Sequence, residues 1–270
     1  MGSNDVPPAH VPSHVVPMYN FLLQVGGGLW TLTYILYARE SFKSQSYGMP
    51  LFALALNFAW ELVYALYVAE SPLEKSVFVC WLIIDCFMVY GLIKFAKHEW
   101  VHSPWVARRI GMIFAVMAVL ATVGHWSFAK WWIDNDMGKR EGKYYRGVVG
   151  PDTSELGFWS ACVCQLHLSA ASLAQLLVRQ HSGGVNWSIW FSRTLGSVIG
   201  FNILYGWDWY FWPEAHQYFV TPMGLFFWIT ALLCDLAYGF VLWQVRKTEI
   251  ITSTGRRIAG SGGDGRPKAH

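Results

Sequence analysis

The chain alternates between long apolar runs and short polar segments along most of its length. A helix needs about 20 mostly apolar residues to cross the hydrocarbon core of a bilayer. Seven runs approach this length, and the sixth is the least apolar because it contains Arg193 and Asn202. Six spans is therefore the alternative count. The seven predicted spans are Met18–Ala38, Leu51–Ala69, Val77–Ala96, Ile110–Ala129, Phe158–Leu177, Ile189–Leu204 and Pro222–Val245.

Composition supports the same class of protein. Apolar residues make up 54% of the sequence and charged residues 14%, whereas an ordinary soluble chain carries about 25% charged residues. The 16 Trp suit the membrane interface, where Trp and Tyr concentrate. A net charge of +3 spread over many loops is no footprint for nucleic acid, so no nucleic-acid partner is expected. We predict an all-α, polytopic integral membrane protein with a seven-transmembrane-helix bundle, and we exclude a soluble globular domain.

The spans divide the chain into three parts. Residues 1–17 form a polar amino-terminal segment, residues 18–245 a seven-helix membrane domain, and residues 246–270 a tail rich in Gly, Arg and Ser that we expect to be disordered. With seven spans, 14 of the 20 Lys and Arg residues fall on one side of the membrane. Positive charge favours the cytosolic side. We therefore expect a multi-pass protein of the endoplasmic reticulum, with a lumenal amino terminus and a cytosolic tail.

Three acids lie inside the predicted spans, where an ionisable side chain costs a few kcal/mol. They are Glu61, Asp85 and Asp235, and His125 adds a fourth ionisable group. Glu61 and Asp235 each lie 11 residues from the cytosolic end of their helix, which is roughly 16 Å at 1.5 Å per residue. Both are therefore expected near the midplane, where two carboxyls at one depth can face a common cavity.

Polar and aromatic neighbours extend the surface around these acids. Asn57, Glu61 and Tyr64 follow i, i+4, i+7 spacing, so one face of their helix is polar over two turns. Trp228 and Tyr238 lie seven residues before and three residues after the acid of the last helix. A buried hydrogen bond between helices, without chemistry, is the alternative interpretation. The candidate substrate-binding residues are Asn57, Tyr64, Asp85, His125, Trp228 and Tyr238.

Several short motifs along the chain occur in a specific order. They are Tyr47-Gly-Met49, Asn57-Phe-Ala-Trp-Glu-Leu-Val-Tyr64, Gly124-His125, Cys164-Gln-Leu166, Ser192-Arg193, Trp212-Pro-Glu-Ala215 and Asp235-Leu-Ala-Tyr-Gly239. With this ordered set, the chain resembles the fungal membrane-bound terpene cyclases of the pyripyropene and paxilline type, which act in meroterpenoid and indole-diterpene pathways. The insertion from Trp131 to Asp152 departs from the shorter loop of that family.

This resemblance implies an enzyme that folds a linear prenyl chain, carried on an aromatic or polyketide head, into fused rings. The two acids of the family map onto Glu61 and Asp235, which are the predicted catalytic residues. A carboxyl buried in an apolar cavity favours its neutral form and can act as a general acid toward a terminal epoxide or alkene. The resemblance further implies a functional link to a prenyltransferase and a flavin epoxidase that prepare the substrate.

No cofactor or metal is expected. The helices contain no D-x-x-x-D or D-D-x-x-D motif, which a Mg²⁺–diphosphate chemistry would use, and the last span contains no Lys for a Schiff base. A proton-coupled transporter or a receptor with seven helices is the alternative function. A transporter would favour helices broken by Gly or Pro near the acids, and Gly239 is the only such residue nearby.

Overall fold

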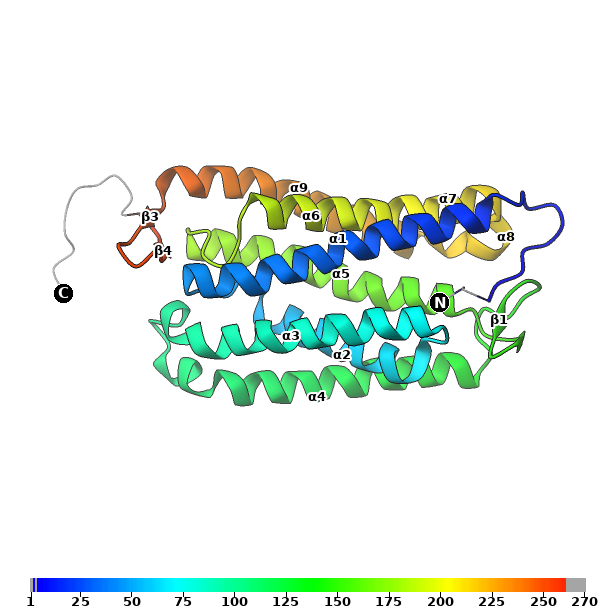
Figure 1. Ribbon diagram of the computed structural model, residues 1–270, viewed down its shortest axis with the longest axis horizontal. Helices are drawn as coiled ribbons and strands as arrows, with labels where there is room; N and C mark the ends of the chain where they lie inside the picture. The colour runs from blue at the N-terminus through cyan, green and yellow to red at the C-terminus, as the bar shows by residue number, and fades with distance from the viewer. Residues whose placement is uncertain (1, 3, 261–270) are drawn as a thin grey trace.

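The computed structural model describes residue 2 and residues 4–260 as an elongated bundle of helices (Figure 1). The start of α1 and the β1–β2 hairpin lie at one end, called here the amino end. The β3–β4 hairpin lies at the other, called the carboxyl end (Figure 1). The elements are α1 (Val15–Ser44), α2 (Leu51–Val63), η1 (Tyr64–Val68), α3 (Pro72–Glu99), α4 (Pro104–Asp134), β1 (Tyr144–Tyr145), β2 (Val148–Val149), α5 (Thr153–Arg179), α6 (Trp187–Ser197), η2 (Val198–Ile203), α7 (Leu204–Phe211), α8 (Pro213–His216), η3 (Gln217–Val220), α9 (Pro222–Thr248), β3 (Ile250–Ile251) and β4 (Arg257–Ile258).

Within the described residues, six helical segments are long and apolar enough to cross a membrane. They are α1, α2 with η1, α3, α4, α5 and α9. Each contains one of the predicted windows, except that α2 with η1 ends at Val68, one residue before the end of its window. The remaining window, Ile189–Leu204, falls in a helical run that passes from α6 through the π-helical η2 into α7. The chain is thus a helical, multi-pass membrane protein.

Side-chain caps explain where several helices begin. Ser71, Asp152, Asn186 and Thr221 each accept a hydrogen bond from a backbone N–H in the first turn of α3, α5, α6 and α9. A cap of this kind contributes about 1 kcal/mol by satisfying a donor that has no partner inside the helix. A proline in the first turn of α3 and α9 adds a backbone angle that already suits the helix.

The helices α1 and η2 come unusually close together. A Cβ atom added at Gly26 would lie 2.4 Å from the Cα of Gly200, so each position requires a glycine. The π-helical turn η2 therefore lies directly against the middle of α1. This contact brings the sixth helical run into the wall of the bundle interior.

A buried ion cluster holds the amino end together. Lys143, in the long loop before α5, is 0% exposed and lies 2.8 Å from Asp5 and 3.2 Å from Asp152. Burial acts to lower the pKa of Lys143, but Asp152 and Asp5 outweigh it and raise the pKa. The charged amine of Lys143 therefore links the inserted loop to the amino-terminal segment.

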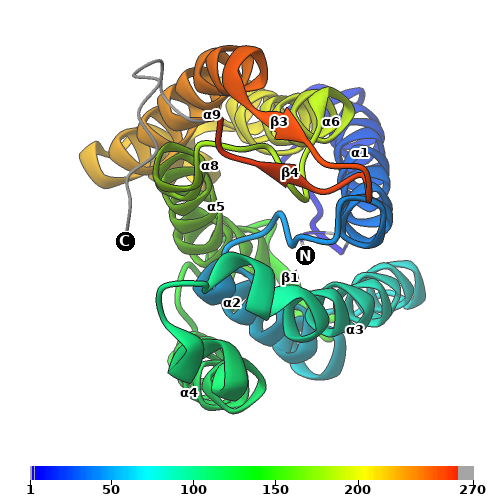
Figure 2. The same ribbon diagram turned by 90° about the vertical axis from the view of Figure 1, so that its left-hand side faces the viewer.

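The predicted boundaries at the carboxyl end need correction. The helix α9 continues to Thr248, and β3 pairs antiparallel with β4, whereas a disordered tail from residue 246 was expected. Arg257 pairs with Glu249, and Arg256 donates a hydrogen bond of 2.7 Å to the carbonyl of His98. These contacts hold the hairpin across the end of the bundle (Figure 2). The rest of the predicted tail, residues 261–270, lies outside the described residues.

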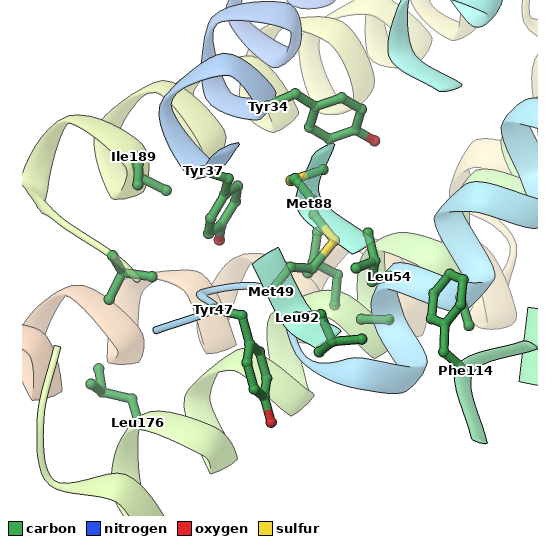
Figure 3. Packing of buried hydrophobic residues seen from close by; sticks show 14 of the residues in the cluster. Tyr34, Tyr37, Tyr47, Met49, Leu54, Met88, Leu92, Phe114, Leu176 and Ile189 are labelled. Carbon is green, nitrogen blue, oxygen red and sulfur yellow. The ribbon is translucent and has the colours of Figure 1, made fainter. Parts of the chain in front are cut away.

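Apolar packing fixes α2 against α3. Figure 3 shows Leu54, Met88 and Leu92 packed together with Met49 and Tyr34. Leu54 lies two turns before the acid of α2, and Met88 and Leu92 lie one and two turns after the acid of α3. Since lipid is as apolar as these side chains, van der Waals packing holds such helices together. The cluster therefore sets how the two acids face each other.

Candidate active site

Two acidic side chains meet between α2 and α3. Glu61 and Asp85 are both 0% exposed, and their carboxyl groups are close neighbours. Two adjacent carboxylates repel each other, so such a pair favours a state in which one carboxyl carries a proton. Within the described residues, none of the four carboxyl oxygens has a hydrogen-bond partner. The pair is a buried acid site without a compensating cation.

A tyrosine and an asparagine border this pair. The Tyr34 hydroxyl lies near Glu61 and accepts a bond of 3.0 Å from the side-chain amide of Asn57. Asn57 lies one turn before Glu61 on α2, which is the polar face that the sequence spacing predicts. The hydroxyl of Tyr34 is thereby held beside the acid pair.

A cavity of about 420 Å³ lies on the other side of Tyr34 and Asn57, between α1, α2, α3, α5 and η2. This volume lies within the range of about 300–1,000 Å³ that ligand pockets occupy. Trp60, Phe78 and Trp81 add aromatic surface to its wall. A largely apolar ligand in this cavity would lie against aromatic faces, with the acid pair behind one polar patch of the wall.

Asp235 belongs to a different cluster. Its Oδ1 lies 2.7 Å from a terminal nitrogen of Arg193, and both side chains are almost completely buried. The guanidinium also donates hydrogen bonds of 3.1 Å to the hydroxyls of Tyr37 and Ser172, and it lies over the ring of Tyr238. These contacts compensate a buried charge that would otherwise be strongly destabilising.

Gln165 connects this ion pair with the cavity. Its side-chain amide donates a hydrogen bond of 3.4 Å to Oδ2 of Asp235, and Gln165 itself lines the cavity. Glu61, Asp85 and Asp235 do not themselves line this cavity: the Glu61–Asp85 pair lies behind Tyr34 and Asn57, and the carboxylate paired with Arg193 lies behind Gln165. Glu61 and Asp235 therefore approach the same cavity through different lining residues, and the nearest acid to Glu61 is Asp85.

The other predicted site residues lie in several places. Asn57 lines the cavity, whereas Tyr64 donates to or accepts from the Ser160 hydroxyl at 2.5 Å. The indole of Trp228 stacks on Phe219 near the amino end and donates to the Phe219 carbonyl at 3.3 Å. Tyr238 contacts the guanidinium of the ion pair. A direct role in substrate binding stays a prediction for Tyr64, Trp228 and Tyr238.

His125 lies in a second, more apolar groove of about 540 Å³ between α2, α4, α5 and α9. A wall of bonded side chains separates this groove from the cavity. The Trp60 indole donates 2.9 Å to Ser160, and His125 Nε2 lies 3.7 Å from the sulfur of Cys164. The residues that line the groove are Leu56, Ala121, Gly124, His125, Phe128, Trp132, Trp159, Ser160, Val163 and Phe227.

Three residues around the cavity are not among the candidate site residues of the sequence analysis. Arg193 carries a usable signal, because a lone arginine in an apolar span needs a carboxylate partner. Gln165 stands in the Cys164-Gln-Leu166 motif, whereas Tyr34 carries no signal, since tyrosine occurs in many membrane helices without a site. Their importance comes from the packing of α1 and α5 around the cavity.

The fold and this site together define a helical membrane protein with acids buried beside an apolar cavity. A family model described as Pyr4-like transmembrane terpene cyclases matches residues 3–248. The chain belongs to this family and is a terpene cyclase. Membership selects an enzyme over the alternative of a transporter or receptor, and it confirms the resemblance drawn from the motifs.

Curated fungal relatives are similar over most of the chain. The terpene cyclase ascF of Acremonium egyptiacum is 45% identical over 258 residues, covering 96% of this chain and 93% of the relative. The terpene cyclase dpchB of Colletotrichum higginsianum is 37% identical, with 82% and 83% covered. The terpene cyclase ptmB of Penicillium ochrochloron is 35% identical, with 87% and 89% covered. No solved structure matches the chain.

Proposed function

We propose that this terpene cyclase protonates the terminal epoxide of a prenyl chain on an aromatic or polyketide head, and that the chain then cyclises in the cavity beside Glu61. The observation that carries this proposal is the buried Glu61–Asp85 pair, which has no compensating cation and lies behind Tyr34 and Asn57. Two adjacent carboxyls repel each other strongly when both are ionised, so the pair retains a proton at neutral pH.

Initiation transfers this proton to the epoxide oxygen. The carbon–oxygen bond breaks, and the carbon that becomes cationic is attacked by the nearest double bond of the chain. Tyr34 would extend the reach of the pair, because it lines the cavity and lies near Glu61. General acid catalysis of this kind contributes about 10²–10⁴-fold to the rate.

The cavity then protects and stabilises the moving cation. Aromatic faces attract a cation by roughly 0.5–2 kcal/mol each. Trp60, Phe78 and Trp81 supply such faces along one side of the cavity. An apolar wall also excludes water, which would otherwise add to the cation and stop the cascade.

Termination requires a base, and we assign it to Asp235. Arg193 holds this side chain as a carboxylate, which is a weak base. A weak base suffices, because a C–H bond next to a carbocation is strongly acidic. The epoxide oxygen keeps the proton that it received, and the last carbocation loses one, so the overall reaction is an isomerisation without a cofactor or a metal.

In the membrane we propose seven spans, of which α6, η2 and α7 form the sixth. Residues 187–211 of this run would extend about 37 Å at 1.5 Å per residue, which exceeds a hydrocarbon core of about 30 Å. With seven spans the amino end is lumenal and the carboxyl end cytosolic in the endoplasmic reticulum. A prenyltransferase and a flavin epoxidase would supply the substrate.

The test is Glu61→Gln, which keeps shape and polarity but removes the transferable proton. Microsomes carrying the variant and fed the epoxidised prenyl substrate should form no cyclised product, although the protein accumulates normally. Glu141→Gln is the matched control, since Glu141 is exposed in the long loop. A Glu61→Gln enzyme with near wild-type turnover would show that the pair is only a structural bond.

A further inference from the structure

The helices α1 and α3 pack closely in one half of the bundle and separate in the other. Toward the carboxyl end, the rings of Phe42 and Tyr90 stack at 5.8 Å. Nearer the middle, the Trp81 indole donates a hydrogen bond of 2.7 Å to the Thr31 hydroxyl. Beyond this bond, the two helices diverge toward the amino end (Figure 1). Where the divergence begins, the contacts around Trp81 join α3 to α1.

The cavity opens where the two helices separate. Gln24 and Gly28 of α1, together with Leu73 and Val77 of α3, line it from opposite sides; these four residues define the α1–α3 slot. Gln24, Gly28 and Leu73 are exposed on the outside of the bundle, and Leu73 is 63% exposed. One continuous surface thus leads from the lipid-facing side of the bundle to the inner wall of the cavity.

Trp81 lies at the inner end of this slot. Its ring contacts Tyr34 edge-to-face at 5.8 Å, and Tyr34 is next to Glu61. On the other helix, a Cβ atom added at Gly27 would lie 3.9 Å from the Trp81 ring. A chain that passes the slot would therefore meet Trp81 first and the acid pair directly behind it.

Other approaches to the cavity are covered by described residues. The cluster around Lys143 closes the amino end, and the β3–β4 hairpin lies across the carboxyl end. The second groove is separated from the cavity by the bond from Trp60 to Ser160 and by the contact of His125 with Cys164.

We infer that the linear isoprenoid chain of the substrate enters sideways from the lipid through the α1–α3 slot, and that Gly28 and Trp81 determine which chains pass. The inference rests on the proposed function, since it takes the cavity beside Glu61 as the place of cyclisation. An isoprenoid chain dissolves in the bilayer, so a lateral opening lets it reach the acid without crossing water.

Gly28→Leu tests the inference. A Cβ atom at Gly28 meets nothing within 4 Å, so a side chain can begin there without a clash, at a position that lines the slot. Replacing a glycine in the middle of a helix also favours the helix. We expect KM for the full-length prenyl substrate to rise about tenfold or more with kcat unchanged, and to rise less for a substrate shortened by one isoprene unit.

Gly124→Leu is the matched control. Gly124 also lies in the middle of a helix with nothing within 4 Å of an added Cβ atom, but it lines the second groove. We expect its KM to remain that of the wild type. A series of Ala, Val and Leu at position 28 should raise KM in order of side-chain volume, so the result does not depend on one variant folding.

Three outcomes would overturn the inference. They are an unchanged KM across the series at position 28, a raised KM in Gly124→Leu alone, and a loss of kcat without a change of KM. The proposed function is tested separately. Gly28→Leu retains full turnover at saturating substrate if only access is affected, whereas Glu61→Gln should remain inactive at every substrate concentration.

Discussion

Arg193 and Asp235 form an ion pair of 2.7 Å in the interior of the bundle, where both side chains are almost completely buried. The arginine comes from α6 and the aspartate from α9, so the pair fixes one weakly apolar helical run against the last helix. The acid of α9 is therefore a paired carboxylate, whereas the acid of α2 has another acid as its partner. Two acids at similar depth thus have different chemistry because their partners differ.

Replacing Arg193 alone should destabilise the protein more than replacing both Arg193 and Asp235. Arg193→Met leaves the Asp235 carboxylate buried without a cation, which should destabilise the protein by about 3–5 kcal/mol. The double variant Arg193→Met/Asp235→Asn should recover much of this loss, although it lacks the terminal base and should make no product. Thermal unfolding in detergent of the two variants and of Asp235→Asn checks this. Equal stabilities of Arg193→Met and the double variant would contradict the ion pair.

The sequence predicts the spans well because the bilayer imposes a simple rule on them. A run of about 20 apolar residues is typical of a transmembrane helix and uncommon elsewhere. The run from α6 to α7 is harder to predict as a span, since Arg193 lowers its apolar character and the sequence does not show its partner on α9. The prediction of a disordered tail is wrong for residues 246–260 for a related reason. Its Gly, Arg and Ser content is typical of disorder, but Arg256 and Arg257 hold the hairpin to the end of the bundle.

The site could be predicted only in part. Cost of burial singles out Glu61, Asp85 and Asp235 as unusual, and all three are buried in the structure. The depth of an acid in the membrane does not determine which other acid it meets. That depends on which face each helix turns toward its neighbour, and depth carries no information about this. The packing of Leu54 against α3 decides that Glu61 meets Asp85, and this information is not present in the spacing of polar residues.

Acid should destabilise the amino end through His216. This buried side chain lies 3.3 Å from the amine of Lys143 and 2.7 Å from the Tyr218 hydroxyl. Burial lowers its pKa well below 6.5, and Lys143 and Arg140 lower the pKa further, although Asp208 lies 3.9 Å away. The unfolded chain therefore binds a proton that the folded chain rejects, and stability is lost as the pH falls below about 6.5.

The loss of stability in acid corresponds to the binding of one proton. Unfolding free energy should fall by up to about 1.4 kcal/mol per pH unit below pH 6.5 because of His216 alone. Thermal unfolding of the detergent-solubilised enzyme at pH 7.5 and pH 5 measures it. In His216→Gln, which retains an acceptor for Lys143, the drop between the two pH values should be smaller. A drop of the same size in both proteins would rule out this histidine as the cause.

The proposed topology predicts an unused glycosylation sequon. Asn186-Trp-Ser188 is a formal acceptor site at the start of α6, on the carboxyl side that we assign to the cytosol. The Asn186 amide also donates a hydrogen bond of 3.0 Å to Glu40. Expression in a eukaryotic microsome should leave Asn186 unmodified, as judged by unchanged mobility after glycosidase treatment. A glycan at this position would reverse the orientation or change the number of spans.

Cyclisation should not need a divalent metal. The proposed acid initiation uses a proton from the Glu61–Asp85 pair, and the sequence of the helices lacks the acid-rich motif that binds Mg²⁺ and a diphosphate. Adding EDTA to membranes that contain the enzyme should leave the rate of product formation unchanged. A rate that falls with EDTA and returns with Mg²⁺ would favour diphosphate chemistry instead.

Asp85→Asn should separate the two members of the acid pair. An asparagine at this position keeps the shape and polarity of Asp85, and Glu61 remains buried and can carry the proton. We therefore expect measurable activity, reduced by about 10–100-fold, against a loss of about 10²–10⁴-fold or more in Glu61→Gln. Groups that act as a unit are not additive, so the double variant should be no worse than Glu61→Gln. Product formation under single-turnover conditions measures all three. If Asp85→Asn were as inactive as Glu61→Gln, the transferred proton would have to be assigned to Asp85 as well.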